Sequence, residues 1–174
     1  MKPSTARTFR IERGIGDAIE RVAKERRVSI NQVVNSALRR YVEWDEAISN
    51  RGLVSVPSLL LVKLMAEQSE VKAHELGRWA GRELFLPNMK AERATPAVED
   101  AERLMRMLGN HGRRFTFDHT VEGTKHIITI GQKMGRNWSA YYAGALEAIF
   151  EKLLGKTLRE TISETICVVE FGES

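Results

Sequence analysis

Cysteine and long apolar runs are what this sequence has least of. Its single cysteine, Cys167, excludes an intrachain disulfide framework and a zinc site built from several cysteines. Cys167 stands in an apolar run, which favours a buried structural thiol over a reactive one. The run Leu59–Val62 is far shorter than the roughly 20 residues of a bilayer span, and the N-terminus lacks the apolar core of a signal peptide. We therefore expect a cytoplasmic protein without a membrane partner.

The usual signatures of catalysis are also missing. The sequence contains no nucleotide-binding loop, no nucleophile motif and no paired metal ligands at helical or turn spacing. We therefore expect no enzyme activity, no cofactor and no metal site. His119 and His126 could face each other across a hairpin, but ordinary strand histidines are the favoured interpretation of this pair over metal ligands.

The positive charge is concentrated at the start of the chain. Residues 1–42 hold ten Lys and Arg against four Asp and Glu, a net charge of +6. The whole chain carries +4, so the remainder is mildly acidic. A basic head on an acidic body indicates a polyanionic partner, with a solvated basic surface as the alternative.

The basic head predicts a short strand followed by two helices. Polar and apolar residues alternate over Arg7–Glu12, which places Phe9 and Ile11 on one face of a half-buried strand. Ser29 as N-cap and Gln32 three residues later form a capping box at the start of the second helix. Each helix has an apolar stripe, and the second should be buried from end to end. The stripes are Ile15, Ala18, Ile19, Val22 and Ala23, and then Ile30, Val33, Val34, Ala37, Leu38 and Tyr41.

A single strand and two short helices cannot form a stable unit alone. The strand leaves its edge unpaired, and about 40 residues bury too little surface. We expect a twofold homodimer in which the two strands pair antiparallel above four helices. Phe9 and Ile11 then face the helices, and Thr8 and Arg10 lie on the outer face of the ribbon.

The segments Thr8–Ile11, Ile15–Ala23, Val28–Gln32 and Ala37–Tyr41 together resemble the ribbon-helix-helix repressors of the Arc and MetJ type. The resemblance covers about a quarter of the chain. In that family a two-stranded ribbon enters the major groove of DNA and reads base edges. The resemblance implies base contacts at the outward-facing strand positions Ala6, Thr8 and Arg10.

These three residues differ in the contacts that they offer. Arg10 can donate two hydrogen bonds to guanine, Thr8 can hydrogen-bond or touch a thymine methyl, and Ala6 offers only apolar contact. For Arg10, a merely solvated arginine is the alternative interpretation.

The family also clamps phosphate at the amino end of the second helix, where backbone N–H groups and the helix dipole favour an anion. By resemblance this clamp consists of Ser29, Ile30 and Asn31. The sequence departs from the family at Arg27, where a glycine is usual, and at the glycines Gly14 and Gly16 that open the first helix. Arg27 could add a phosphate contact.

The rest of the chain predicts an α+β body after a hinge at residues 49–52. We expect one helix to begin at Pro57 and a second to cover Val71–Phe85 and to stop at Pro87. A third should begin at an N-cap, Thr95, and end at Gly109. Two strands, 115–121 and Lys125–Ile130, form a hairpin, and a helix follows from Trp138 to Gly155. A last strand covers Thr165–Phe171. Trp138 and Tyr142 are core residues or, less favoured, line a ligand cavity.

Parts of the body from Trp138 to Phe171 resemble, faintly, small-molecule-binding domains of the vinyl-reductase type, although that family's cysteine set is absent apart from Cys167. The organisation expected is residues 1–48 as a ribbon-helix-helix DNA-binding domain and residues 52–174 as an α+β sensing or oligomerisation domain, with a small-molecule effector as one interpretation. The function expected is a sequence-specific transcriptional regulator that binds double-stranded DNA. The alternative is an antitoxin that represses its own operon and binds a toxin through its C-terminal part.

Overall fold

The computed structural model describes residues 5–45, 56–90, 97–155 and 158–172. The chain divides into two compact units, Met1–Leu53 and Val54–Ser174, and each is described by itself. The hinge predicted at residues 49–52 and the N-cap predicted at Thr95 lie outside the described residues. Within the described ranges, none of the helices combines the length and the hydropathy that a bilayer crossing needs.

The N-terminal unit contains two consecutive helices, as predicted. They are α1, Arg13–Arg26, and α2, Ile30–Arg40, and a wider turn η1, Tyr41–Asp45, extends α2. The capping box is confirmed: the Gln32 backbone N–H donates to Ser29 Oγ at 3.2 Å, and the Ser29 N–H donates to Gln32 Oε1 at 2.9 Å.

The turn between α1 and α2 depends on one residue in an unusual conformation. Arg27 has φ 53° and ψ 44°, the left-handed region that glycine occupies without strain. Its backbone N–H donates to Lys24 O at 3.2 Å, and the Val28 N–H donates to Ala23 O at 3.0 Å, so the end of α1 is capped. Arg27 thus adopts, at a steric cost, the conformation that glycine takes without strain.

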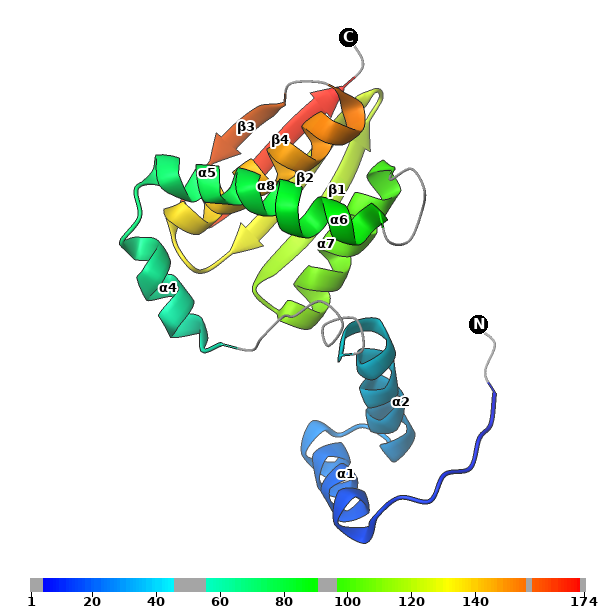
Figure 1. Ribbon diagram of the computed structural model, residues 1–174. Coiled ribbons are helices and arrows are strands. Elements are labelled where there is room, and N and C mark those ends of the chain that lie inside the picture. Colours follow the sequence, from blue (N-terminus) through cyan, green and yellow to red (C-terminus); the bar gives the residue numbers. More distant parts are fainter. Residues whose placement is uncertain (1–4, 46–55, 91–96, 156–157, 173–174) are drawn as a thin grey trace. The chain divides into compact units, whose positions relative to one another are not determined.

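The strand predicted over residues 7–12 is not present as a paired strand. Residues 5–12 form neither a helix nor a hydrogen-bonded strand, and Figure 1 shows them as an extended segment leading into α1. The expected burial of the α2 stripe was also wrong for the single chain, since Ile30 is 50% exposed and Leu38 49%, and no residue of α2 is buried. Phe9, in the segment before α1, is 64% exposed. Over residues 5–45, Ala23 is the one buried side chain. Within residues 5–45 there is no paired strand and no second pair of helices to cover these apolar side chains.

The C-terminal unit is a mixed helical and antiparallel domain, as expected of an α+β fold. Its helices are α4, Ser58–Ala66, α5, Glu70–Ala80, α6, Leu86–Lys90, α7, Val98–Gly112, and α8, Arg136–Leu154, with a wide turn η2, Gly81–Phe85, joining α5 to α6. Its strands are β1, Phe115–Glu122, β2, Lys125–Gln132, β3, Arg159–Ile162, and β4, Ile166–Gly172. They form one antiparallel sheet in the order β1-β2-β4-β3.

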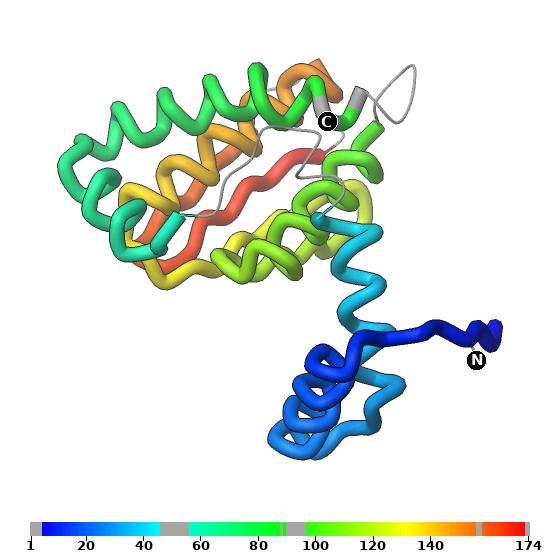
Figure 2. The backbone as a smooth tube through the Cα atoms, turned by 60° about the horizontal axis from the view of Figure 1, so that its bottom comes forward, coloured from blue at the N-terminus to red at the C-terminus, as the bar shows by residue number. Residues whose placement is uncertain are grey.

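The core lies between one face of this sheet and the helices. Helix α8 packs against β2, β3 and β4, α7 packs against β1, and α5 packs on the outer side of α8 (Figures 1 and 2). Side chains from alternate strand positions and from α8 close the core, because successive strand residues point to opposite faces. The largest fully buried side chains are Phe150, Met105, Ile128, Ile130, Leu146, Ile149 and Val169.

The predicted hairpin, the long helix and the last strand are confirmed, but three details were wrong. Pro87 does not stop the helix: Leu86 N–H donates to Gly81 O, five residues back, and this wide turn places Pro87 in the first turn of α6, where no N–H is needed. Helix α7 continues past Gly109 to Gly112 and ends at Arg113, with φ 53°. Strand β3 was not predicted.

Two glycines allow α5 and α8 to cross at close range. A Cβ added at Gly77 would lie 2.0 Å from Tyr141 O, and one added at Gly144 would lie 2.2 Å from His74 O. Any side chain at either position would force the two backbones apart. The glycines therefore set the distance between the α5 and α8 side chains on either side of the crossing.

Candidate functional site

The three strand residues predicted to contact bases are all exposed. Ala6, Thr8 and Arg10 alternate with Arg7 and Phe9 in the extended segment before α1. In an extended chain, residues at even positions lie on one side and residues at odd positions on the other. An extended segment can therefore present Ala6, Thr8 and Arg10 together on one face.

The residues predicted to contact phosphate lie together at the start of α2. Ser29 is the N-cap, Ile30 and Asn31 form the first turn, and Arg27 precedes the cap by two residues. The capping box uses the N–H groups of Ser29 and Gln32. The N–H groups of Ile30 and Asn31 lie in the first turn, where no earlier helical turn supplies a carbonyl acceptor. They and the helix dipole can bind an anion there.

The side chain of Asn31 is held by a residue one turn further along α2. Asn35 Nδ2 donates to Asn31 Oδ1 and to the Asn31 carbonyl oxygen, each at 2.9 Å. This assigns the oxygen end of the Asn31 amide to Asn35, so the amide nitrogen is the end that can donate to phosphate. Asn35 was not among the predicted site residues, although its spacing of four residues from Asn31 on one helix makes the contact readable from the sequence.

The histidine pair of the hairpin meets as predicted. His119 Nε2 lies 3.0 Å from His126 Nδ1, and the rings stack with centroids 5.2 Å apart. The other nitrogen of His119, Nδ1, lies 3.3 Å from Glu102 Oε2. His126 also stacks on Phe171. Both rings thus pack at the edge of the core.

Of three other residues considered in the sequence, two lie in the core and one lines a cavity. Cys167 is buried, as predicted, and burial raises the pKa of its thiol to about 12. Tyr142 packs in the core against Phe115, with ring centroids 4.9 Å apart. Trp138 lines an apolar cavity of about 350 Å³ together with Trp79 and Leu64.

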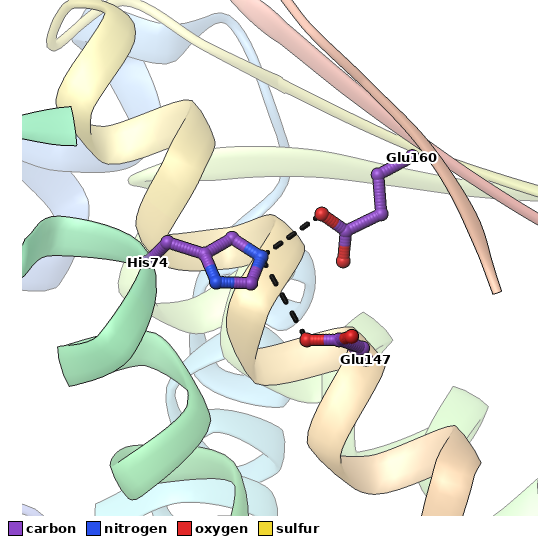
Figure 3. A group of neighbouring side chains, drawn as sticks. All are labelled: His74, Glu147 and Glu160. Atoms are coloured by element: carbon purple, nitrogen blue, oxygen red, sulfur yellow. Dashed lines mark hydrogen bonds and ion pairs between the residues drawn. The ribbon is translucent and has the colours of Figure 1, made fainter. Parts of the chain in front are cut away.

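A cluster that sequence reasoning missed joins three elements of the C-terminal unit (Figure 3). His74 on α5 lies between Glu147 on α8 and Glu160 on β3. The distances from His74 Nε2 are 2.9 Å to Glu160 Oε2 and 3.8 Å to Glu147 Oε2. One ligand atom from each residue lies within 4.8 Å of the others, so the group can hold a metal ion. His74, Glu147 and Glu160 are far apart in the sequence, so no motif with a fixed spacing predicts the cluster.

The electrostatics of this cluster are dominated by carboxylates at partly buried positions. Burial raises the pKa of Glu160, and the charge of Glu147 adds to this effect, against the hydrogen bond to His74. Arg78 contacts Glu147, and its Nη2 donates to Glu151 Oε2 at 2.9 Å. The hydrogen bonds to both glutamates outweigh burial and raise the pKa of Arg78.

Comparison with known proteins gives no match, either to models of protein families or to curated sequences. Functional interpretation therefore depends on the residues of this chain.

Proposed function

We propose that the protein is a homodimeric, sequence-specific DNA-binding regulator whose N-terminal unit reads the major groove with a two-stranded ribbon. The observation that carries this proposal is the exposure of Phe9, Ile11 and the α2 stripe beside an extended segment with an unpaired edge. A second copy would bury these apolar side chains and pair the edge in one step. The outward face would then present Thr8 and Arg10.

The chemistry of the outward face and of the α2 start supports DNA as the ligand. The guanidinium of Arg10 matches the O6 and N7 acceptors of guanine, and Thr8 matches a hydrogen-bonding edge or a thymine methyl. The start of α2 supplies donors for phosphate beside a basic residue, Arg27. Protein–DNA recognition requires both kinds of contact: contacts to bases specify the DNA sequence, and contacts to phosphates position the protein on the duplex.

The C-terminal unit favours a regulator over an antitoxin. Its core is formed by its own helices and sheet. Antitoxin tails that fold on a toxin are short and lack an independent core. We propose that this unit senses a signal or assembles dimers further, and we place the protein in the cytoplasm.

Selection from random double-stranded DNA tests the proposal. The full chain is incubated with a library, bound molecules are amplified over several rounds, and the pool is sequenced. We expect enrichment of an inverted repeat, because a twofold dimer reads two half-sites related by the same symmetry. Sedimentation at micromolar concentration should show a dimer. A pool without an enriched motif, or a folded monomer, would contradict the proposal.

A further inference from the structure

We propose that His74, Glu147 and Glu160 form a binding site for one divalent transition-metal ion, represented by Zn²⁺. The site lies wholly in the C-terminal unit and does not depend on the proposed DNA binding. One imidazole nitrogen and two carboxylate oxygens converge there from α5, α8 and β3 (Figure 3). Three protein ligands with a remaining position for water or a small molecule are typical of reactive or sensing zinc sites.

The distances fit an ion at the centre of the group. Two ligands bound at about 2.0–2.2 Å to one ion are separated by about 2.8–3.6 Å, the lower values at octahedral and the higher at tetrahedral angles. The distance from His74 Nε2 to Glu160 Oε2, 2.9 Å, lies within this range, and the distance to Glu147 Oε2, 3.8 Å, lies slightly above it. Small side-chain rotations would therefore complete the coordination, and the backbone would stay in place.

The local charge and the burial also fit a divalent cation. The side chains of His74, Glu147 and Glu160 are 24%, 18% and 19% exposed, so their charges are only partly screened by water. The contacts join three carboxylates, those of Glu147, Glu151 and Glu160, to the single guanidinium of Arg78. Because Arg78 also contacts Glu151, its charge is shared between two carboxylates and does not neutralise the site.

A carboxylate oxygen of the cluster is available and the site has an entrance. Glu160 Oε1 is buried, and within the described ranges no hydrogen-bond donor reaches it. A buried acceptor without a partner is costly, and a cation would satisfy it. His74 also lines a surface cavity of about 530 Å³ with Val71, Glu75 and Ile162, which connects the imidazole to solvent.

The donor set selects among metals. An imidazole nitrogen favours Zn²⁺, Co²⁺ or Ni²⁺ over Mg²⁺ and Ca²⁺, which prefer oxygen ligands alone. Co²⁺ is the spectroscopic probe, because its visible absorption reports the coordination geometry. We expect the chelator-treated full chain to bind one equivalent of Zn²⁺ by isothermal titration calorimetry, and Co²⁺ to develop a visible band that Zn²⁺ abolishes.

Paired variants assign the site. His74→Ala and Glu160→Gln should each weaken Zn²⁺ binding by more than roughly 100-fold, because the loss of a direct ligand exceeds the 10–100-fold effect of outer-shell changes. The control His119→Ala removes a histidine of the hairpin pair and should leave the affinity unchanged. Glu160→Gln keeps the size of the side chain, so it tests the site even if His74→Ala does not fold, and circular dichroism checks both folds.

Three results would overturn the proposal. The first is that the unaltered chain binds no Zn²⁺. The second is that both His74→Ala and Glu160→Gln bind Zn²⁺ as tightly as the unaltered chain. The third is that His119→Ala abolishes Zn²⁺ binding, which would place the ion at the hairpin. In the first two cases the group is an internal hydrogen-bonded bridge between α5, α8 and β3.

Discussion

Replacing Gly144 by alanine should destabilise the C-terminal unit, because α5 and α8 touch at this residue. The new Cβ would lie 2.2 Å from His74 O and 3.0 Å from His74 C, so the atoms would have to separate by about 1 Å to reach an ordinary contact. Overpacking of a close-packed interior costs about 1–3 kcal/mol, and a clash with backbone belongs at the upper end. The better helix propensity of alanine returns roughly 1 kcal/mol. We expect a net loss of about 2 kcal/mol.

The matched control is Gly16→Ala in α1. Nothing lies within 4 Å of a Cβ added at Gly16, so this change should stabilise α1 by about 0.5–1 kcal/mol. The free energy of unfolding is measured by urea denaturation of the full chain at one protein concentration, and hydrogen exchange read by mass spectrometry localises each effect. If hydrogen exchange in α5 and α8 is the same in Gly144→Ala as in the unaltered chain, the two helices are not in contact through Gly144.

Two further changes test the α1–α2 turn and the α7–β1 contact. Arg27→Gly should stabilise the N-terminal unit by about 0.5–1 kcal/mol because it relieves the left-handed strain, whereas Arg27→Ala should not. Burial acts to raise the pKa of Glu102, but hydrogen bonds from Arg106 and His119 hold this pKa below its ordinary value. Glu102→Gln should therefore destabilise the chain at pH 7, with a difference that shrinks as the pH falls from the ordinary glutamate range through the lowered pKa of Glu102. Both predictions are tested by thermal denaturation of each variant beside the unaltered chain. A melting curve of Arg27→Gly or of Glu102→Gln at pH 7 that equals the curve of the unaltered chain would contradict the corresponding prediction.

Elements with strong local signals were predictable from the sequence. The capping box at Ser29 and Gln32 fixes the start of α2, and alternation around Gly123 fixes the β1–β2 hairpin. Helix α8 ends at Gly155, which has φ 66°, as its glycine indicates. In these cases the side chain that sets the boundary acts on backbone a few residues away, so tertiary contacts are not needed to place it.

The features that were missed depend on packing between distant segments. Strand β3 spans four residues, Arg159–Ile162, too few for an alternating pattern, and pairing with β4 forms it. The helix continues through Pro87 because η2 shifts the hydrogen-bond register, which no local pattern reveals. His74 and Glu160 lie 86 residues apart and meet only through the sheet and the α5–α8 crossing. The buried dimer core expected for the N-terminal unit needs a second chain.

Three substitutions, at Arg10, Arg7 and Asn31, test the proposed contacts of the ribbon face and of the α2 start with DNA. Arg10→Ala should flatten discrimination at one base pair of each half-site, where a bidentate contact is worth about 1–3 kcal/mol. Arg7→Ala removes the same charge from the other face of the ribbon and should keep the discrimination. Asn31→Ala should weaken binding to every sequence alike, because phosphate contacts carry no base information.

The direct measurement is competition binding of these variants to the selected inverted repeat and its single-base variants, at several salt concentrations. We expect that, of the three variants, only Arg10→Ala changes the ratios of affinities between sequences. The ratios for Arg7→Ala and Asn31→Ala should equal those of the unaltered chain. If Arg10→Ala binds every site with the unaltered ratios, the ribbon does not read bases through Arg10, and the proposed mode of DNA recognition is contradicted.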